Sequence, residues 1–275
     1  MNTRSFKNGN TQLLGLIGSN LSASHSFCLH NRAIQSQHRN AVYVPFQSTQ
    51  SNWNALLTLD NFLGANVTMP HKEVLFSKMD ELTDRAQTIG AINTIHKTNG
   101  QLIGDNTDSI GFLSAVQQYN IPWLERPIYI LGAGGSAKAI CYALHTVGVQ
   151  NIYVWNRTPK RLQSLSTLIQ NIQWWNIKEA LPSNAIVIQC TSLGQQKEDP
   201  LPMQQWTSEH IVLDLIYHQT PLLKRVLSAG GTAINGIGML IHQAAHSFAR
   251  WFDCPPPISL MTQQFLHHYK TESST

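Results

Sequence analysis

Short apolar runs recur in the second half of the chain and alternate there with amphipathic segments. They cover residues 128–131, 152–155, 186–190 and 211–215, and Ile, Val, Leu and aromatic residues dominate each of them. Runs of this length are typical of strands buried on both faces of a parallel sheet. Helical patterns cover residues 137–147 and 241–252. The alternation predicts a doubly wound α/β sheet.

The first half has shorter and more polar elements. Strands are predicted over residues 12–17, 41–45, 62–69, 91–97 and 101–104, and helices over 27–37 and 53–59. Asn99-Gly100 lies between the last two strands and indicates a β-hairpin, which would place Asn93 on the first of them. Because proline suits the first turn of a helix, we expect a helix to begin at Pro70, just before Lys72. The tail from residue 267 to 275 is expected to be a solvated end.

A glycine-rich turn follows the apolar run that ends at Leu131. It consists of Gly132, Ala133, Gly134, Gly135, Ser136 and Ala137, and a helical pattern follows it. A strand, such a turn and a helix form the phosphate-binding corner of a dinucleotide fold. Glycines allow the tight turn and the close approach of a pyrophosphate, and the helix N-terminus offers free N–H groups to it. The turn predicts a dinucleotide cofactor.

The end of the next strand indicates which dinucleotide is bound. Enzymes that prefer NAD place an acidic residue there to hold the ribose 2′-hydroxyl. This chain instead has Asn156, Arg157 and Thr158. A guanidinium can grip a 2′-phosphate through two hydrogen bonds, and the neighbours can add neutral ones. We therefore predict NADP as the cofactor.

Composition narrows the class of protein. A chain of 275 residues is long enough for two domains. No apolar run is long enough to cross a membrane, the polar start has no secretory pattern, and the net charge of +4 is dispersed. The four cysteines are scattered, which fits a reducing compartment. We expect a cytoplasmic protein that acts on a small molecule and binds neither nucleic acid nor membrane, as a monomer or homodimer.

Several polar residues of the first half are candidates for binding a substrate. Ser24 and Ser26 precede a predicted helix and could hold a carboxylate, although they could equally be helix caps. Asn66, Thr68 and Lys72 should converge at one edge of the sheet. Lys72 could also be an ordinary surface lysine, and Asp108 could serve only to compensate a helix dipole. His242 and His246 are four residues apart, but no third ligand is evident, so no metal is predicted.

Taken together, the chain from about residue 13 to 266 resembles the shikimate dehydrogenase family. The resemblance is carried by residues 64–72, 90–94, 104–108 and 236–243, which read GANVTMPHK, GAINT, GDNTD and GIGMLIHQ. It implies an α/β fold of two domains: an N-terminal open α/β substrate domain and a C-terminal Rossmann-type NADP-binding domain, with the active site in the cleft between them. We expect the substrate domain over residues 1–107, with helices of residues 238–275 packing back on it, and the NADP domain over 108–237.

The resemblance also implies residue roles. Lys72 and Asp108 would be the catalytic pair. Substrate contacts would come from Ser24, Ser26, Asn66, Thr68, Lys72, Asn93, Asp108, Tyr217 and Gln243. The cofactor would be held by Gly132, Ala133, Gly134, Gly135, Ser136, Ala137, Asn156, Arg157, Thr158, Thr191, Gly236 and Met239, and Leu215 should lie beside the nicotinamide. The implied reaction interconverts shikimate and 3-dehydroshikimate by hydride transfer, on the route to chorismate and the aromatic amino acids.

One loop departs from the family pattern, which reads His-Ser-x-Ser-Pro. Here Ala23 stands in place of the histidine and Phe27 in place of the proline. Without the proline ring the serine hydroxyls could shift, and such a shift could change the affinity for a carboxylate or the choice of substrate. A quinate or dual-substrate dehydrogenase, with a relaxed choice of substrate or cofactor, therefore stays open as an alternative. So does a catalytically silent NADP-binding regulatory protein. Whether Lys72 acts as a base or as an ammonium donor and anchor is also open.

Overall fold

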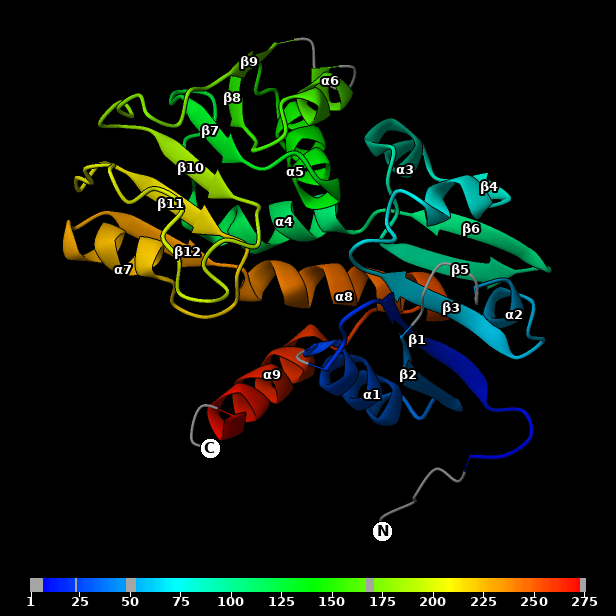
Figure 1. The fold of residues 1–275 in the computed structure, drawn as a ribbon. Helices are drawn as coiled ribbons and strands as arrows, with labels where there is room; N and C mark the ends of the chain where they lie inside the picture. Colours follow the sequence, from blue (N-terminus) through cyan, green and yellow to red (C-terminus); the bar gives the residue numbers. More distant parts are fainter. Residues whose placement is uncertain (1–6, 23, 48–52, 167–170, 273–275) are drawn as a thin grey trace. The chain divides into compact units, whose positions relative to one another are not determined.

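The protein is seen in a computed structural model that describes residues 7–22, 24–47, 53–166 and 171–272. The chain divides into two compact units. Unit 1 consists of Met1–Thr107 and Ile241–Thr275, and unit 2 consists of Asp108–Leu240. Each unit contains one six-stranded sheet (Figure 1). None of the described helices is both long and apolar enough to cross a membrane.

Unit 1 is built on a mixed sheet with the strand order β2-β1-β3-β5-β6-β4. Its strands are β1 (Gln12–Gly18), β2 (Ala41–Gln47), β3 (Phe62–Val67), β4 (Glu81–Leu82), β5 (Thr94–Thr98) and β6 (Gln101–Asp105). The central strand β1 runs parallel to β2 and β3, and β5 is antiparallel to both β3 and β6. The open α/β sheet predicted for the first half is therefore confirmed.

The hairpin predicted at Asn99-Gly100 joins β5 to β6. Asn99 has φ 51° and Gly100 has φ 80°, and Thr98 pairs with Gln101 across the turn. These left-handed conformations explain why asparagine and glycine occupy the turn. Asn93, however, precedes β5 instead of lying on it. Its backbone still bonds to the segments on both sides: the Asn93 carbonyl accepts from the Val67 N–H at 2.7 Å, and the Asn93 N–H donates to the Asp105 carbonyl at 3.0 Å.

The helix predicted from Pro70 is wrong. The Met69–Pro70 peptide is cis, and the His71 N–H donates to the Thr68 carbonyl at 2.9 Å, so that a tight turn follows β3. A short 3-10 helix, η1 (Leu75–Lys78), comes next. Lys72 therefore lies in a turn and not in the first turn of an α-helix. Its carbonyl accepts from the Ile92 N–H at 2.9 Å, which ties this turn to the segment before β5.

The helices of unit 1 include the C-terminal one. They are α1 (Ser26–Ser36), α2 (Trp53–Leu57), α3 (Asp84–Ile89), the part of α8 (Ile237–Phe252) from residue 241 onward, and α9 (Ile258–Glu272). Helix α9 packs along α1 (Figure 1). The end expected to be solvated from residue 267 continues as helix α9 to residue 272. His267 is exposed as expected, whereas His268 and Tyr269 are half-buried and contact His25. Residues 273–275 lie outside the described residues.

Unit 2 is a parallel sheet with the order β12-β11-β10-β7-β8-β9. Its strands are β7 (Ile128–Leu131), β8 (Ile152–Trp155), β9 (Ile172–Trp174), β10 (Ile186–Gln189), β11 (Ile211–Asp214) and β12 (Thr232–Asn235). All neighbouring pairs are parallel, and the strand order reverses between β7 and β10. This is the predicted doubly wound, Rossmann-type arrangement, whose reversal point is the usual place for a cofactor.

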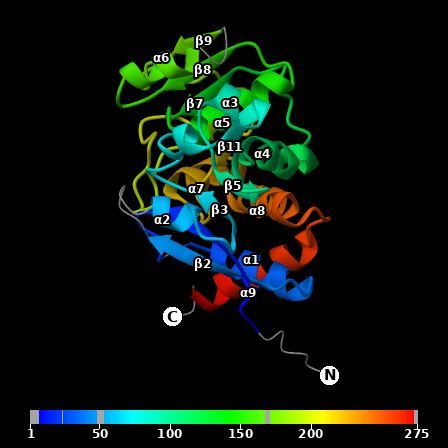
Figure 2. The same ribbon diagram turned by 90° about the vertical axis from the view of Figure 1, so that its right-hand side faces the viewer.

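Helices α4 (Asp108–Val116), α5 (Gly135–Thr146), α6 (Lys160–Ser166) and α7 (Pro221–Ser228) belong to unit 2. Helices α4 and α5 lie side by side (Figures 1 and 2). They enclose an apolar core that contains Phe112, Ile130, Cys141 and Ile188. Burial raises the pKa of the Cys141 thiol to about 12. The core holds the strand ends in register and thereby positions the loops that carry the predicted cofactor residues.

Candidate functional site

The serine loop connects β1 to α1. Ser26 is buried and Ser24 is half-buried, and the Ser26 N–H donates to Ser24 Oγ at 3.3 Å. The N-cap residue of α1 is His25, whose side chain makes no capping bond. Neither serine is therefore the N-cap of α1, so the helix-cap alternative is wrong, whereas Ser24 accepts a hydrogen bond within the turn and lies beside Ser26. Ala23 lies outside the described residues.

Asn66 is the centre of a buried hydrogen-bond network in unit 1. Its Nδ2 donates to Ser247 Oγ of α8 at 2.9 Å, and to the Asn93 carbonyl and Thr94 Oγ1 at 3.2 and 3.3 Å. Its Oδ1 accepts from the Tyr43 hydroxyl at 2.9 Å. Because both ends of this amide have partners inside the protein, its orientation is fixed.

The network continues to two other predicted residues. Asn93 Nδ2 donates to Thr107 Oγ1 at 2.9 Å and to Gln243 Oε1 at 3.3 Å. Asn93 Oδ1 accepts from the Thr107 N–H at 2.7 Å. Ser247 Oγ in turn donates to the Gln243 carbonyl at 3.0 Å. The structure therefore brings Asn66, Asn93 and Gln243 together, although they are far apart in the sequence.

Tyr43 supports Asn66 from the core of unit 1. Its ring stacks on His30, with ring centroids 4.4 Å apart, and His30 is wholly buried. Burial lowers the pKa of His30 to about 3, so the imidazole is neutral at any physiological pH. Sequence reasoning missed Tyr43 and Ser247 altogether. The four-residue spacing of Gln243 and Ser247 on a helix was the one signal that could have indicated the latter.

Thr68 and Lys72 lie on either side of the turn that follows β3. Thr68 donates its backbone N–H to the Ile17 carbonyl at 2.9 Å, beyond the last residue of the strand. Its methyl group reaches Gly18, where an added Cβ would come within 2.5 Å of Thr68 Cγ2. Only glycine fits there, so Gly18 allows β1 and Thr68 to approach. Both predicted side chains are half-buried and so remain accessible in part.

In unit 2 the glycine turn connects β7 to α5. Gly132 has φ +113°, and a Cβ on it would lie 3.2 Å from Thr191 Cγ2, so Thr191 packs against the turn. A Cβ on Gly134 would meet nothing within 4 Å. Gly134 is the N-cap of α5 and provides no side chain to cap its first N–H groups. The turn thus offers open space in front of a helix N-terminus, which suits a pyrophosphate.

The residues that follow β8 form the second part of the predicted cofactor site. The Gly132 N–H donates to the Trp155 carbonyl at 2.8 Å, which joins this strand end to the glycine turn. Asn156 Nδ2 donates to the Thr158 carbonyl at 2.8 Å and closes a tight turn. Arg157, inside that turn, is exposed. The arrangement leaves its guanidinium available for a 2′-phosphate.

Two further loops of the unit 2 sheet are held by the last residue of their strand. Gln189 ends β10, donates to the Leu193 carbonyl at 2.6 Å and accepts from the Thr191 N–H at 2.8 Å. Asp214 ends β11 and accepts from the Ile216 N–H at 3.1 Å and from Thr220 Oγ1 at 2.8 Å. Both residues were missed by sequence reasoning, since a polar residue at the end of an apolar run carries no signal of its partner.

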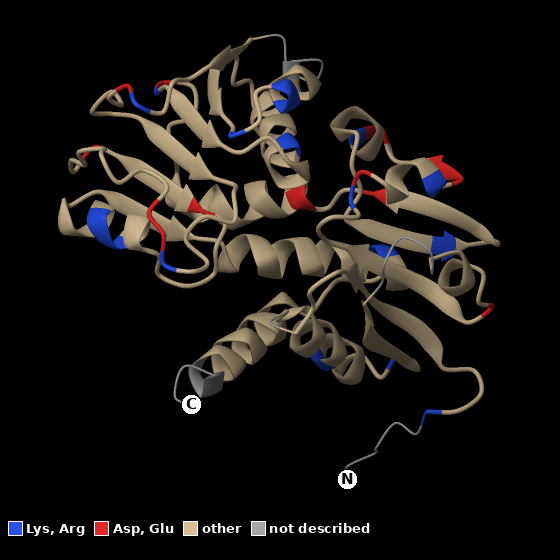
Figure 3. Cartoon of the chain, viewed as in Figure 1, with Lys and Arg blue, Asp and Glu red and all other residues tan. Residues whose placement is uncertain are grey.

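Asp214 is the one charged residue in the described strands of this sheet (Figure 3). Its side chain is almost fully buried, and burial raises the pKa of the carboxyl to about 6. Its two hydrogen bonds and the charge of His218 act in the opposite direction. Asp214 therefore opposes folding when ionised and helps to shape the loop that carries Tyr217.

Asp108 and Tyr217 interact electrostatically within unit 2. Asp108 is the first residue of α4 and is buried. Burial raises the pKa of the Tyr217 phenol to about 12, and the negative charge of Asp108 acts in the same direction. The phenol therefore stays protonated and can donate a hydrogen bond at neutral pH.

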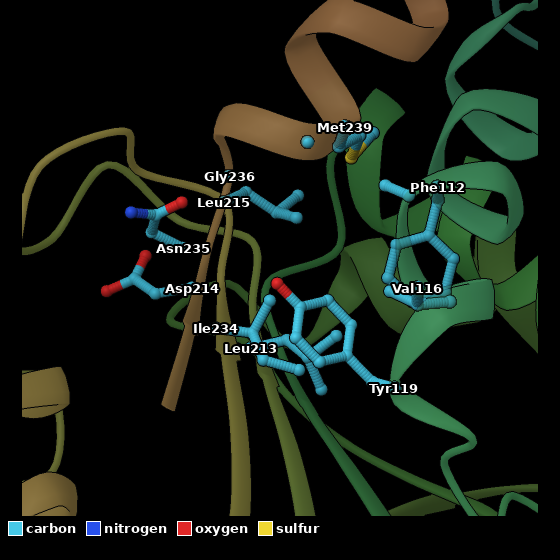
Figure 4. Close-up of a pocket in the computed structure, with 12 residues that line it drawn as sticks. Phe112, Val116, Tyr119, Leu213, Asp214, Leu215, Ile234, Asn235, Gly236 and Met239 are labelled. Atoms are coloured by element: carbon cyan, nitrogen blue, oxygen red, sulfur yellow. The ribbon is translucent and has the colours of Figure 1, made fainter. Parts of the chain in front are cut away.

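A pocket in unit 2 collects three of the predicted cofactor residues. Leu215, Gly236 and Met239 line it together with side chains of α4 (Figure 4). A Cβ on Gly236 would lie 2.1 Å from the Leu215 carbonyl oxygen, so glycine is required where these two loops meet. The walls are largely apolar, and Phe112 and Met239 both contribute to them (Figure 4).

The fold and these two sets of residues define a class of protein, a two-domain oxidoreductase. Its N-terminal domain is an open α/β substrate domain, and its C-terminal domain is of the Rossmann type. Comparison with known families gives three matches: the shikimate dehydrogenase substrate binding domain over residues 16–95, the shikimate / quinate 5-dehydrogenase model over 115–200, and the shikimate 5′-dehydrogenase C-terminal domain over 236–264.

Matches to individual relatives cover nearly the whole chain. The shikimate dehydrogenase (NADP(+)) of Desulforamulus reducens is 35% identical, and the match covers 92% of this chain and 94% of the relative. The crystal structure of shikimate 5-dehydrogenase from Thermus thermophilus, in complex with NADP(H) and shikimate, is 30% identical with a TM-score of 0.84, over 92% and 98% of the chains. Quinate dehydrogenase from Corynebacterium glutamicum, in complex with NAD, is 28% identical with a TM-score of 0.81, over 94% and 99%. The chain belongs to the shikimate dehydrogenase family.

Proposed function

We propose that this protein is an NADP-dependent dehydrogenase that interconverts shikimate and 3-dehydroshikimate, a step toward chorismate and the aromatic amino acids. The observation that carries the proposal is Arg157 after β8, with no acidic residue beside it, in a chain 35% identical to a shikimate dehydrogenase (NADP(+)). The guanidinium supports NADP over NAD because it can pair with a 2′-phosphate.

The proposed domain roles follow the two units. Residues 1–107, with the helices of 238–275, would bind the substrate, and residues 108–237 would bind NADP. The glycine turn, Arg157 and Thr191 support the second assignment, since all three lie at the carboxyl edge of the unit 2 sheet. The buried network around Asn66 and Asn93 supports the first, since fixed amides suit a ligand that carries several hydroxyls.

The residues of unit 1 would orient the substrate and handle its proton. Ser24 and Ser26 would hold the carboxylate, and Asn66, Thr68, Asn93 and Gln243 would contact or position the ring hydroxyls. Lys72 would exchange or stabilise the proton of the reacting hydroxyl, with Asp108 as its partner and Tyr217 as a further donor. NADP supplies the hydride chemistry when it is bound. Dehydrogenation thus needs the protein to supply a proton acceptor and to orient the reacting hydroxyl of the substrate.

The direct test is a spectrophotometric assay of the purified protein with four substrate and cofactor pairs. Shikimate and quinate are each combined with NADP and with NAD, and the appearance of reduced nicotinamide is followed. We expect the largest kcat/KM with shikimate and NADP. A larger kcat/KM with quinate would indicate a quinate dehydrogenase. Binding of NADP without turnover of either acid would indicate the silent regulatory protein.

The proposal also covers the cellular location of the protein and its assembly state. We place the protein in the cytoplasm, because its four cysteines are scattered along the sequence without the spacing of a disulfide framework. Its partners would be the small molecules alone, and the assembly would be a monomer or a homodimer. Sedimentation velocity across a range of protein concentrations distinguishes the two states.

A further inference from the structure

The serine loop differs from the family pattern in sequence. That pattern has a histidine before the first serine and a proline after the second. In this chain His25 lies between the serines and Phe27 follows them. Both side chains pack on aromatic rings of unit 1. Phe27 lies 5.8 Å from the Tyr43 ring, centroid to centroid, and His25 points to helix α9.

The His25 imidazole contacts three aromatic rings of α9. Its centroid lies 5.0 Å from Phe265, 5.8 Å from His268 and 6.2 Å from Tyr269, with interplanar angles of 72°, 85° and 63°. These are edge-to-face contacts, a favourable geometry for aromatic pairs. Phe265 is fully buried and stacks on Tyr269 at 5.5 Å. The imidazole therefore packs against a rigid aromatic surface.

The backbone of His25 transmits this contact to both serines. Its carbonyl accepts from the Leu29 N–H at 3.3 Å and from Cys28 Sγ at 3.0 Å, so it is fixed to the first turn of α1. Ser24 and Ser26 are its immediate neighbours, and they share the 3.3 Å hydrogen bond described above. When the ring of His25 is held, the backbone of the two serines is held as well, which limits where their hydroxyls can lie.

We propose that His25 is a positioning residue for substrate binding, which holds Ser24 and Ser26 in a carboxylate-binding arrangement by packing its ring on helix α9. This inference rests on the proposed function, since it assigns the substrate carboxylate to the two serines. The contact with α9 does here what proline does elsewhere in the family. Holding a loop in its bound conformation raises affinity because less conformational freedom is lost on binding.

The test compares three variants of the full-length protein in steady-state kinetics. His25→Ala removes the ring, His25→Phe keeps an aromatic edge, and His267→Ala removes an exposed neighbour on the same helix as a control. We expect His25→Ala to raise the KM for shikimate about three- to tenfold, given the usual strength of aromatic pairs. The kcat and the KM for NADP should stay close to the wild-type values. His25→Phe should restore most of the shikimate KM.

Other outcomes overturn the inference. An unchanged shikimate KM in His25→Ala would do so, as would a fall in kcat of the same size as the change in KM. If His25→Phe behaved like His25→Ala, a ring nitrogen and not packing would matter. Should His25→Ala fail to fold, Tyr269→Ala changes the same contact from the half-exposed side and should raise the shikimate KM. A wild-type protein inactive on shikimate would reject the proposed function itself, before any variant is compared.

Discussion

The two units place their buried polar groups differently. In unit 1 they converge: Asn66, Asn93, Thr107 and Ser247 form one network that joins β3, the segment before β5 and helix α8. In unit 2 the buried polar residues of the described strands, Gln189 and Asp214, lie at strand ends, and each holds the loop that follows. Unit 1 thus fixes side chains, whereas unit 2 fixes backbone turns.

This difference matches what each unit is proposed to bind. A ring with several hydroxyls is recognised by amide and hydroxyl side chains whose orientation is set in advance. A dinucleotide is recognised mainly through backbone N–H groups and a few charged side chains at strand ends. Substitutions in unit 1 should therefore affect substrate and chemistry, and substitutions in unit 2 should affect cofactor binding and stability.

The largest expected effect concerns Lys72. Lys72→Ala should lower kcat by roughly 10²–10⁴-fold, the usual size of a lost acid or base, and should change the shikimate KM much less. Lys78→Ala, an exposed lysine of the neighbouring η1, serves as the control and should be nearly neutral. Steady-state kinetics measures both. Comparable turnover in Lys72→Ala and wild type would remove Lys72 from the chemistry.

The second largest effect is expected for Asp214, the buried carboxyl of unit 2. Because the pKa of Asp214 is raised to about 6, from an ordinary value near 4, its folded form prefers to be protonated. Its contribution to stability is present below about pH 4 and is lost as the pH rises through about 6. A gap of this size between the unfolded and folded pKa corresponds to at most about 3 kcal/mol. Asp214→Asn should remove this loss.

Urea unfolding between pH 4 and 7 checks the prediction for Asp214. The difference in unfolding free energy between Asp214→Asn and wild type should grow in favour of the variant as the pH rises. Asp60→Asn, an exposed carboxyl of unit 1, provides a matched control. A difference that does not vary with pH would show that Asp214 keeps an ordinary pKa in the folded protein.

Arg157 should affect cofactor choice and leave the substrate unaffected. Arg157→Gln removes a charge-assisted contact to the 2′-phosphate, so kcat/KM with NADP should fall about ten- to a hundredfold while kcat/KM with NAD hardly changes. The shikimate KM should stay the same, as should all parameters of the control Lys224→Ala on α7. Equal losses with both cofactors would mean that Arg157 does not read the 2′-phosphate.

The smallest expected effects concern Gly132 and Gly134 in the β7–α5 turn, because substitution of the first should affect stability and substitution of the second should affect cofactor binding. Gly132→Ala places a side chain at φ +113° and should cost about 1–3 kcal/mol of stability. Gly134→Ala has ordinary backbone angles and open space, so its melting temperature should be unchanged. It should nevertheless raise the KM for NADP by about tenfold, or ~1.4 kcal/mol, by intruding on the pyrophosphate. Thermal melts and cofactor titrations check the pair, and an unchanged KM for NADP in Gly134→Ala would mean that the phosphates bind elsewhere.

Much of unit 2 could be predicted because its signals are local. The strands at residues 128–131 and 152–155 have the predicted bounds, and the glycine turn lies between β7 and α5 as expected. In unit 1 the Asn99-Gly100 hairpin is equally readable, since two residues alone determine its turn type. Apolar runs and glycine turns carry their structure within a few residues.

The failures depend on distant partners. The last part of helix α9 reads as a solvated end because nothing in its own sequence indicates that His268 and Tyr269 contact His25, which lies far away in the sequence. The turn after Met69 reads as a helix because proline suits both. Asn66, Asn93 and Gln243 are recognisable as site residues, but their shared network is not, since Ser247 lies 181 residues from Asn66. Their assignment to substrate, like that of every site residue, stays a prediction.

The thiol of Cys141 provides an internal reporter of how often unit 2 opens. Fully buried, and with its pKa raised to about 12, it has almost no reactive thiolate in the native state. Alkylating reagents should therefore reach it only during transient opening of the apolar core, whereas half-buried Cys28 and Cys254 should react sooner. If adding NADP slows the labelling of Cys141, then binding of the dinucleotide makes the transient opening of unit 2 rarer. This conclusion needs no assay of catalysis.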